Sequence, residues 1–260
     1  MARQFRSDGF LGDDLSSIAS QVHGRYGAHV ELFDRANALA WERQYDLEVD
    51  RNSALEVFSA AYYGRVLMLV QATVLCLERG ITPAGKIVLR SATETLFTLG
   101  ALARRPERIE RIIADTEIRK RDMLKRIKLF ADPSISTVVV DSVESSRLER
   151  LLATEGAVLS AYSLAEDAGL RDWYSTIYSR LCWSVHAAAN DVEDHILTVD
   201  GELQELRNEP EVEGQEYLWM VCTNLCILAM QFASEVFALD IAIVESLNRD
   251  FEALYDPQTK

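Results

Sequence analysis

Residues 80–108 read GITPAGKIVLRSATETLFTLGALARRPER, and this stretch contains the clearest signals of the fold. Gly80 is typical of the residue that ends a helix. Thr82-Pro83 is typical of a helix start, with threonine as the N-cap and proline at the first helical position. Apolar residues then recur three and four positions apart to about Arg104, and Pro106 opens a further helix. The stretch therefore predicts a buried helix between two others.

The same helical period runs through nearly the whole chain, which has only five prolines. We expect helices over about 14–49, 53–79, 82–104, 106–132, 145–166, 172–195 and 215–251. Residues 134–146 favour a loop, and Asp200-Gly201 makes a small β-hairpin near 196–206 a candidate, because that pair suits a two-residue turn. With no repeat and no Gly/Ser-rich linker, the sequence predicts an all-α fold. We expect a single domain over 1–260 that forms an antiparallel bundle of about seven helices.

The composition is that of an ordinary globular protein, with 48% apolar and 26% charged residues. A formal charge of −14 argues against a protein that coats nucleic acid or an anionic membrane with its whole surface. The N-terminal stretch has no apolar run long enough for a signal peptide, and the four cysteines lie in apolar helical contexts that fit reduced thiols. We therefore expect a cytoplasmic protein with no membrane contact and no cofactor.

The two longest apolar stretches, residues 66–77 and 222–244, are expected to be buried helices. The first is too short to cross a bilayer, and the second carries Asn224, Gln231, Glu235 and Asp240. Cys222 and Cys226 lie one helical turn apart within the second stretch, but no second pair of soft ligands accompanies them. We therefore expect core packing of these thiols and no metal site.

A lone histidine, His186, lies in the stretch WYSTIYSRLCWSVHAAANDV, residues 173–192. On a helix, Tyr178, Cys182 and His186 follow one another in steps of four, so the imidazole points inward. Two interpretations remain open: a core histidine whose ring nitrogens are hydrogen-bonded, or a proton-transfer group. A cysteine nucleophile is disfavoured, because a thiol inside a helix lacks a turn that exposes it and donors for an oxyanion.

Arg90 and Glu94 stand one helical turn apart in LRSATETLF, residues 89–97, among apolar neighbours. This helix is so apolar that at least one of the two charges should face a neighbouring helix, where a half-buried charge needs a partner. His186 and Tyr178 are the candidate partners for Glu94. The sequence therefore predicts a buried polar network between this helix and the later histidine-containing helix.

The two quoted stretches, 80–108 and 173–192, together resemble a family of bacterial and archaeal proteins known only as a domain of unknown function. In that family an Arg-Ser-x-x-Glu helix precedes a helix with a tyrosine, a small polar residue and a histidine. The resemblance covers about residues 60–199 and implies an all-helical cytoplasmic protein, but no reaction. The positions that correspond to the family pattern are Arg90, Glu94, Tyr178, Ser184 and His186.

A broader resemblance is to the HEPN superfamily (higher eukaryotes and prokaryotes nucleotide-binding), because Arg180 and His186 are similar to its Arg-x4–6-His pattern. Its small helical bundles often dimerise and cleave RNA without a metal. The resemblance implies that Arg180 stabilises the charge of the pentavalent phosphorane and that His186 assists attack by the 2′-hydroxyl. Both residues are therefore candidate catalytic groups.

Residues 104–128 are strongly basic, with ten basic and five acidic side chains in a chain whose net charge is −14. This contrast makes the segment a candidate anion- or RNA-binding surface. The alternative is a solvated helix crossed by ion pairs such as Glu107–Arg111, Glu117–Arg121 and Asp122–Arg126. The candidate anion-binding residues are Arg104, Arg108, Arg111, Arg119, Arg121 and Lys125.

Two functions remain open at the level of sequence. The first is a non-catalytic interaction or structural module with a buried Arg–Glu–Tyr–His network, which fixes the register of the helices. The alternative is a metal-independent ribonuclease of the toxin or phage-defence type, which uses Arg180 and His186. A second copy of the chain, an RNA and another protein are the candidate partners.

Overall fold

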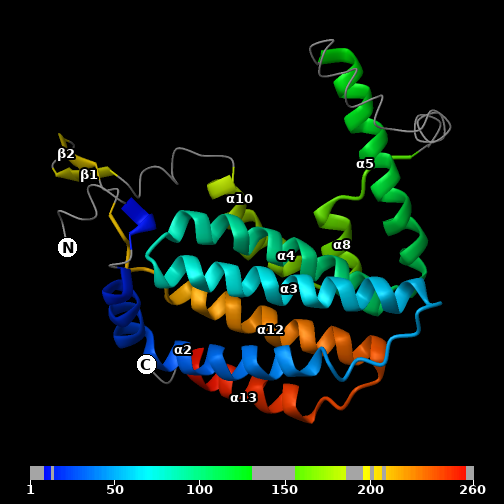
Figure 1. Ribbon diagram of the computed structural model, residues 1–260, viewed down its shortest axis with the longest axis horizontal. Coiled ribbons are helices and arrows are strands. Elements are labelled where there is room, and N and C mark those ends of the chain that lie inside the picture. The colour runs from blue at the N-terminus through cyan, green and yellow to red at the C-terminus, as the bar shows by residue number, and fades with distance from the viewer. Residues whose placement is uncertain are drawn as a thin grey trace.

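Helix α4 (Thr82–Arg104) lies among the helices that form the core, as Figure 1 shows. Every residue from Thr95 to Leu102 is buried, so the second half of this helix is covered on all sides. A Cβ atom on Gly100 would come within 2.7–2.8 Å of Phe232 and Ala168, so glycine allows two neighbouring segments to approach closely here. The computed structural model describes residues 9–12, 15–130, 156–185, 196–199, 202–206 and 209–255.

The core bundle consists of α2 (Ser16–Arg43), α3 (Ala54–Glu78), α4, α12 (Glu216–Phe237) and α13 (Ala242–Tyr255). Helices α3 and α4 lie side by side, and α12 packs against both of them and against α2. Large side chains of α12, among them Trp219 and Phe232, are fully buried at this junction. The prediction of an all-helical bundle is confirmed.

Shorter elements surround the bundle. A 3-10 turn η1 (Gly9–Leu11) precedes α2, and η3 (Pro106–Arg108) leads into α5 (Ile109–Phe130), which extends away from the bundle in Figure 1. Helix α8 (Ala161–Asp167) and the continuous helical segment α9 (Arg171–Trp173), η4 (Tyr174–Tyr178) and α10 (Ser179–Val185) lie over α4. The strands β1 (Ile196–Val199) and β2 (Glu202–Leu206) pair antiparallel, which confirms the predicted hairpin.

The boundaries of α3 and α4 agree with the local signals in the sequence. Ser53 caps α3 by accepting a hydrogen bond from the backbone of Glu56, and Gly80 follows α3 with φ of +70°. A Cβ atom on Gly80 would also clash with Pro210 and Glu211, so the same glycine allows a distant segment to dock. One detail was wrong: Ile81 occupies the N-cap of α4, and Thr82 is already helical.

Three predicted helices end or break at other places. Helix α2 stops at Arg43 instead of about residue 49, and Asp50 forms a separate turn before α3, in which its carboxylate accepts from the backbone of Asn52. The predicted final helix is broken into α12 and α13 at Ala238, which has a left-handed φ of 52°. Residues 156–160 of the predicted helix 145–166 are not helical, and Ser160 caps the much shorter α8.

Several predictions fall outside the residues that the structure describes. These are the loop over 134–146, the part of the 145–166 helix before residue 156, and residues 186–195 with His186. Helices α3 and α12 are long and apolar enough to cross a membrane by length and composition alone. Core helices of soluble proteins pass the same test, and most of the apolar window of α12 is buried against its neighbours.

Candidate functional site

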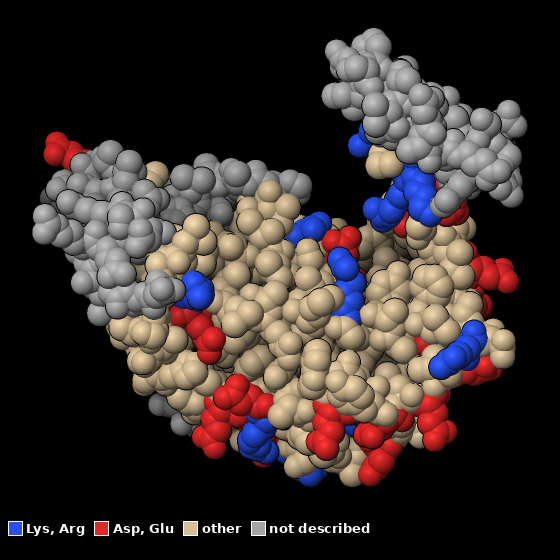
Figure 2. Space-filling view, viewed as in Figure 1, with Lys and Arg blue, Asp and Glu red and all other residues tan. Residues whose placement is uncertain are grey.

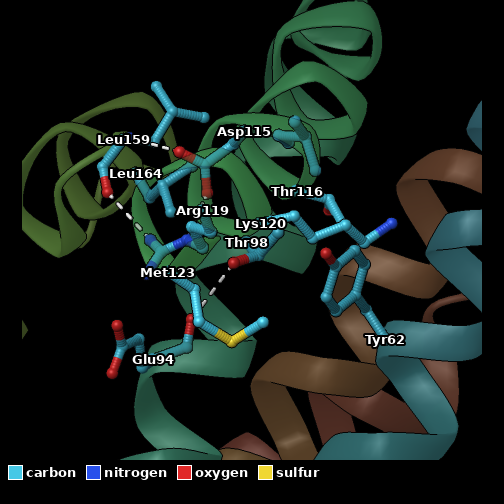
Figure 3. Close-up of a pocket in the computed structure, with 11 residues that line it drawn as sticks. Tyr62, Glu94, Thr98, Asp115, Thr116, Arg119, Lys120, Met123, Leu159 and Leu164 are labelled. Atoms are coloured by element: carbon cyan, nitrogen blue, oxygen red, sulfur yellow. Dashed lines mark hydrogen bonds and ion pairs between the residues drawn. The ribbon is translucent and has the colours of Figure 1, made fainter. Parts of the chain in front are cut away.

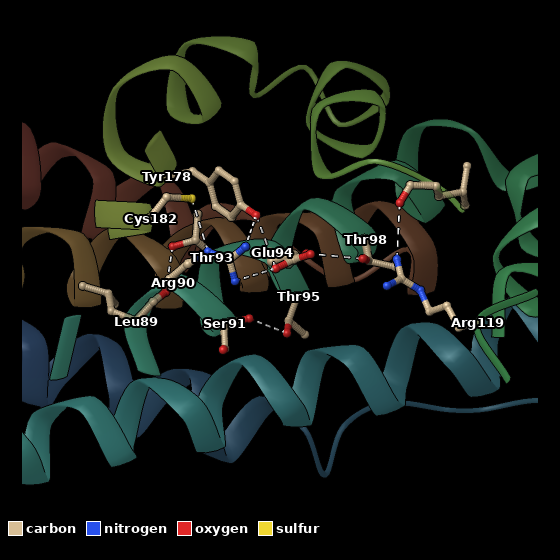
Figure 4. A network of polar contacts seen from close by, with 11 residues as sticks. Leu89, Arg90, Ser91, Thr93, Glu94, Thr95, Thr98, Arg119, Tyr178 and Cys182 are labelled. Atoms are coloured by element: carbon tan, nitrogen blue, oxygen red, sulfur yellow. Dashed lines mark hydrogen bonds and ion pairs between the residues drawn. The ribbon is translucent and has the colours of Figure 1, made fainter. Parts of the chain in front are cut away.

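A polar cluster joins α4 to the helical segment that lies over it, as Figure 4 shows. The Arg90 guanidinium donates to the Tyr178 hydroxyl at 2.6 Å and to the Cys182 sulfur at 3.3 Å. It also forms an ion pair with Glu94 at 3.2 Å, and the Tyr178 hydroxyl donates to the same carboxylate at 3.4 Å. Arg90 therefore contacts three side chains at once, one on its own helix and two on the segment η4–α10.

A π-helical turn brings Tyr178 and Cys182 to this position. The turn η4 contains one wide helical loop, in which the Ser179 hydroxyl donates to the carbonyl of Tyr174 five residues earlier at 2.7 Å. The Tyr178 ring stacks on Tyr174 with 5.2 Å between ring centroids and contacts Phe97 of α4 at 5.6 Å. The aromatic packing orients the phenol toward Arg90 and Glu94.

The electrostatics of the cluster keep Tyr178 and Arg90 protonated at neutral pH. Burial raises the pKa of Tyr178, and the nearby Glu94 carboxylate raises it further, so the phenol stays protonated. Desolvation alone would lower the pKa of Arg90, but the contacts with Cys182, Tyr178 and Glu94 outweigh it and raise the pKa. The guanidinium also lies 4.8 Å from the centroid of the Tyr178 ring.

A pocket of about 420 Å³ adjoins the cluster, and Glu94 belongs to both. Figure 3 shows Tyr62 of α3 and Lys120 of α5 on one side, Asp115 and Arg119 with Leu159 on the other, and Met123 between them. Apolar side chains and hydroxyl or charged groups share its wall in about equal number, so a ligand there would meet both apolar surface and several polar groups. The lining residues are Tyr62, Glu94, Thr98, Ile112, Asp115, Thr116, Arg119, Lys120, Met123, Leu159 and Leu164.

Two side chains of α5 hold the far wall of the pocket in place. The buried Asp115 carboxylate accepts from the backbone N–H of Leu159 at 2.5 Å and forms an ion pair with Arg119 at 2.6 Å. Arg119 in turn donates to the carbonyl of Leu159 at 3.3 Å. Across the pocket, burial and then the Asp115 charge raise the pKa of Tyr62, which therefore remains a neutral hydrogen-bonding group.

Comparison with known protein families supplies a classification but no activity. The model of a family described as "Family of unknown function (DUF5677)" matches residues 56–203, which is more than half of the chain. The chain belongs to this family. The matched region runs from α3 to the β-hairpin and includes Arg90, Glu94 and Tyr178. No curated protein and no solved structure matches the chain.

Membership of DUF5677 confirms the first resemblance, which covered about residues 60–199, but the resemblance to HEPN proteins is not supported. Of the residues that the DUF5677 pattern singled out, Arg90, Glu94 and Tyr178 lie together in the cluster. Ser184 is buried further along α10, and His186 lies outside the described residues. The candidate catalytic Arg180 is exposed, and its guanidinium lies over the Tyr217 ring at 4.9 Å.

Cys182 is a member of the cluster that the sequence did not assign to it. Its spacing of four from Tyr178 was the available signal, since both residues then lie on one helical face. Of the other three helical thiols, Cys222 and Cys226 lie in the core, where burial raises the pKa of both, that of Cys226 to about 12. Their surroundings are those of packed side chains.

The candidate anion-binding residues of this DUF5677 member are largely engaged with groups of the protein itself. Arg104 pairs with Glu235, Arg108 with Asp167, and Arg119 with Asp115. Arg111 donates to the carbonyl of Ala157, Arg121 pairs with Asp122, and Lys125 is exposed. The three predicted pairings were wrong in their partners: the described ion pairs within α5 are Arg119–Asp115, Lys120–Glu117 and Arg121–Asp122, and Arg105 pairs with Glu107 just before the helix.

Proposed function

We propose that this protein is a non-catalytic interaction module that binds a small organic molecule, or an apolar side chain of a partner, in the pocket between α4 and α5. The proposal rests on the contacts of the Arg90–Glu94–Tyr178 cluster and on its position beside the pocket. Its members hydrogen-bond to one another, and one of them, Glu94, also lines the pocket. Such a network fixes the helices around a binding site without a chemical step.

The chemistry of the cluster supports binding over catalysis. A general acid or base works best when its pKa lies near the working pH. The pKa of Tyr178 is raised further above neutrality, and that of Arg90 is raised as well, so neither group exchanges a proton readily near pH 7. A cytoplasmic location is part of the same proposal, since all four cysteines are free thiols.

The binding proposal is tested by thermal unfolding in the presence of a library of small aromatic and aliphatic molecules. A ligand at a hundred times its Kd should stabilise the folded protein by about 2.7 kcal/mol. The variant Met123→Trp should abolish the shift, because Met123 lines the pocket and a larger ring fills it. Ile113→Trp is the matched control on the same helix, at a partly exposed position that does not line the pocket.

The alternative function is RNA cleavage, and one assay distinguishes it from the proposed binding function. Total cellular RNA is incubated in EDTA with the wild-type protein, with Arg180→Ala and with His186→Ala, at equal concentrations of folded protein. We expect no cleavage by any of the three. Cleavage by the wild type that both substitutions abolish, with 2′,3′-cyclic phosphate ends, would overturn the proposal of a non-catalytic module.

A further inference from the structure

Helix α3 carries an exposed apolar face in addition to the face that it buries in the core. Leu75 is 61% exposed, Met68 56% and Val57 40%, which is unusual for three large apolar side chains along one helix. Smaller residues lie between them on the same face. The outward apolar positions from one end of the helix to the other are Ala54, Val57, Ala61, Gly64, Met68, Ala72 and Leu75, and Arg65 is the exposed charged residue among them.

The spacing of this face is that of a helix–helix contact. Its residues follow one another at intervals of three and four, the heptad period with which one helix packs along another. Solvent-exposed helix faces usually carry charged and polar residues. The opposite side of α3, with Val66, Val70 and Leu77, is already buried in the bundle, so the core does not explain the outward row.

We propose that the outward face of α3 binds the same face of a second copy of the chain, with the two helices antiparallel and the twofold axis at Met68. This register places Ala61 opposite Leu75, a small side chain against a large one, and Gly64 opposite Ala72, where two small residues let the helices approach closely. Gly64 leaves room for this approach, since a Cβ atom there would meet nothing within 4 Å. Arg65 of one copy comes opposite Gln71 of the other, so the two Arg65 side chains do not meet.

The distribution of charge favours this face over the others as the contact. Two copies that each carry a formal net charge of −14 repel one another, and they approach most easily through a face with few acidic residues. Figure 2 shows the surface over α3 and α4 as mostly uncharged, whereas acidic residues gather along the side formed by α2 and α13. The same negative charge disfavours an anionic membrane as the occupant.

The area of the face is close to what a specific dimer requires. In this register residues 58–78 of the two α3 helices overlap, a length of about 30 Å at about 1.5 Å per residue. Only the first half of α4, where Ile87 is 43% exposed, adds to the width of about 10 Å, because Thr95–Leu102 are buried. Each copy then contributes roughly 450 Å², and the two copies together approach the total of about 1,000 Å² that a specific interface buries.

Sedimentation equilibrium on the full chain tests the proposal. We expect the wild type to sediment at twice the 29.3 kDa mass of one chain. Met68→Arg should raise the dimer dissociation constant by at least about 100-fold, because two unpaired guanidinium groups would meet at the axis. Ile243→Arg, at a 43% exposed position of α13, is the matched control and should remain dimeric.

A second variant guards against misfolding as the cause of a monomer. Gly64→Leu improves the helix propensity of α3 and meets no neighbour within the chain, yet its side chain blocks the opposing helix. It should be monomeric with an unchanged or higher melting temperature. A monomeric wild type, or a dimer that neither substitution weakens, would overturn the proposal. If the wild type were monomeric and floated with phosphatidylcholine vesicles, and the Met68→Arg variant did not float, the proposal would be overturned in favour of a lipid surface.

Discussion

Arg90 is half-buried, and the free energy of its position depends on how completely its donors are paired. Its side chain is 22% exposed and its guanidinium reaches Tyr178, Cys182 and Glu94. An arginine held between helices without such partners would cost several kcal/mol by desolvation. Glu94 is the counter-charge and Tyr178 bridges the two, so each of the three side chains is supported by the other two.

The hydroxyl of Tyr178 is the part of the cluster that substitution removes most cleanly. We expect Tyr178→Phe to lower the free energy of unfolding by about 1–2 kcal/mol, because it leaves Arg90 and Glu94 each without one hydrogen-bond partner. Urea denaturation measures the loss. Tyr174→Phe is the control, since Tyr174 stacks on Tyr178 but its hydroxyl takes no part in the cluster, and it should cost under about 0.5 kcal/mol. Equal losses from both variants would attribute the effect to ring packing.

At the scale of elements, irregular turns decide where the functional side chains point. The π-helical turn η4 inserts an extra residue into the helix, and the carbonyl of Tyr174 accepts from both the backbone N–H and the hydroxyl of Ser179, five residues later. Without the inserted residue, the side chains that follow it would be rotated by about 100° around the helix axis. The cluster therefore depends on one local departure from α-helical geometry.

The break between α12 and α13 is a second such departure, and it is strained. Ala238 adopts a left-handed conformation with φ of 52°, which costs a residue with a Cβ atom about 1–2 kcal/mol, and the Asp240 carboxylate then caps the backbone of Ala242 at 3.0 Å. Ala238→Gly should raise the free energy of unfolding by about 0.5–1 kcal/mol, as thermal unfolding would measure. Ala229→Gly, inside α12, should lower it by about 1 kcal/mol or more. A loss in both variants would contradict the strained break.

At the scale of the whole molecule, the helices of the bundle share one core, whereas α5 is attached at its margin. The buried residues of α2, α3, α4 and α12 form one continuous cluster. Helix α5 leaves this cluster and is held to the 156–160 segment by Asp115 and Arg119. Regions with few buried contacts open locally at lower free energy than the core does. The pocket wall that α5 supplies is therefore the adjustable one.

Hydrogen exchange tests this difference between core and margin. We expect Asp115→Ala to increase amide exchange in α5 and in residues 156–160, because it removes both the acceptor of the Leu159 N–H and the partner of Arg119. Exchange in α12 should not change. Glu117→Ala, on the same helix, breaks only the exposed pair with Lys120 and serves as the control. Faster exchange throughout the bundle would show that α5 is coupled to the global stability.

Local chemistry explains what could be predicted from the sequence. Ser53, Gly80 and Pro83 act on the residues beside them, so the starts and ends of α3 and α4 follow from caps and turn formers within a few positions. The Asp-Gly turn predicts the hairpin for the same reason. An apolar helix with Arg90 and Glu94 on one face requires polar partners wherever it packs, so the existence of a network was predictable as well.

The sequence by itself therefore determined an all-α bundle, the limits of its central helices, the hairpin and the family. Only the tertiary structure decided that Cys182 joins Arg90, that Glu94 lines a pocket, that the long C-terminal helix breaks at Ala238, and that α3 keeps an apolar face toward solvent. The physical reason is that helical periodicity and capping are set by neighbours in the chain. Which apolar face meets which, and which of several carboxylates an arginine reaches, depends on contacts between residues far apart in sequence.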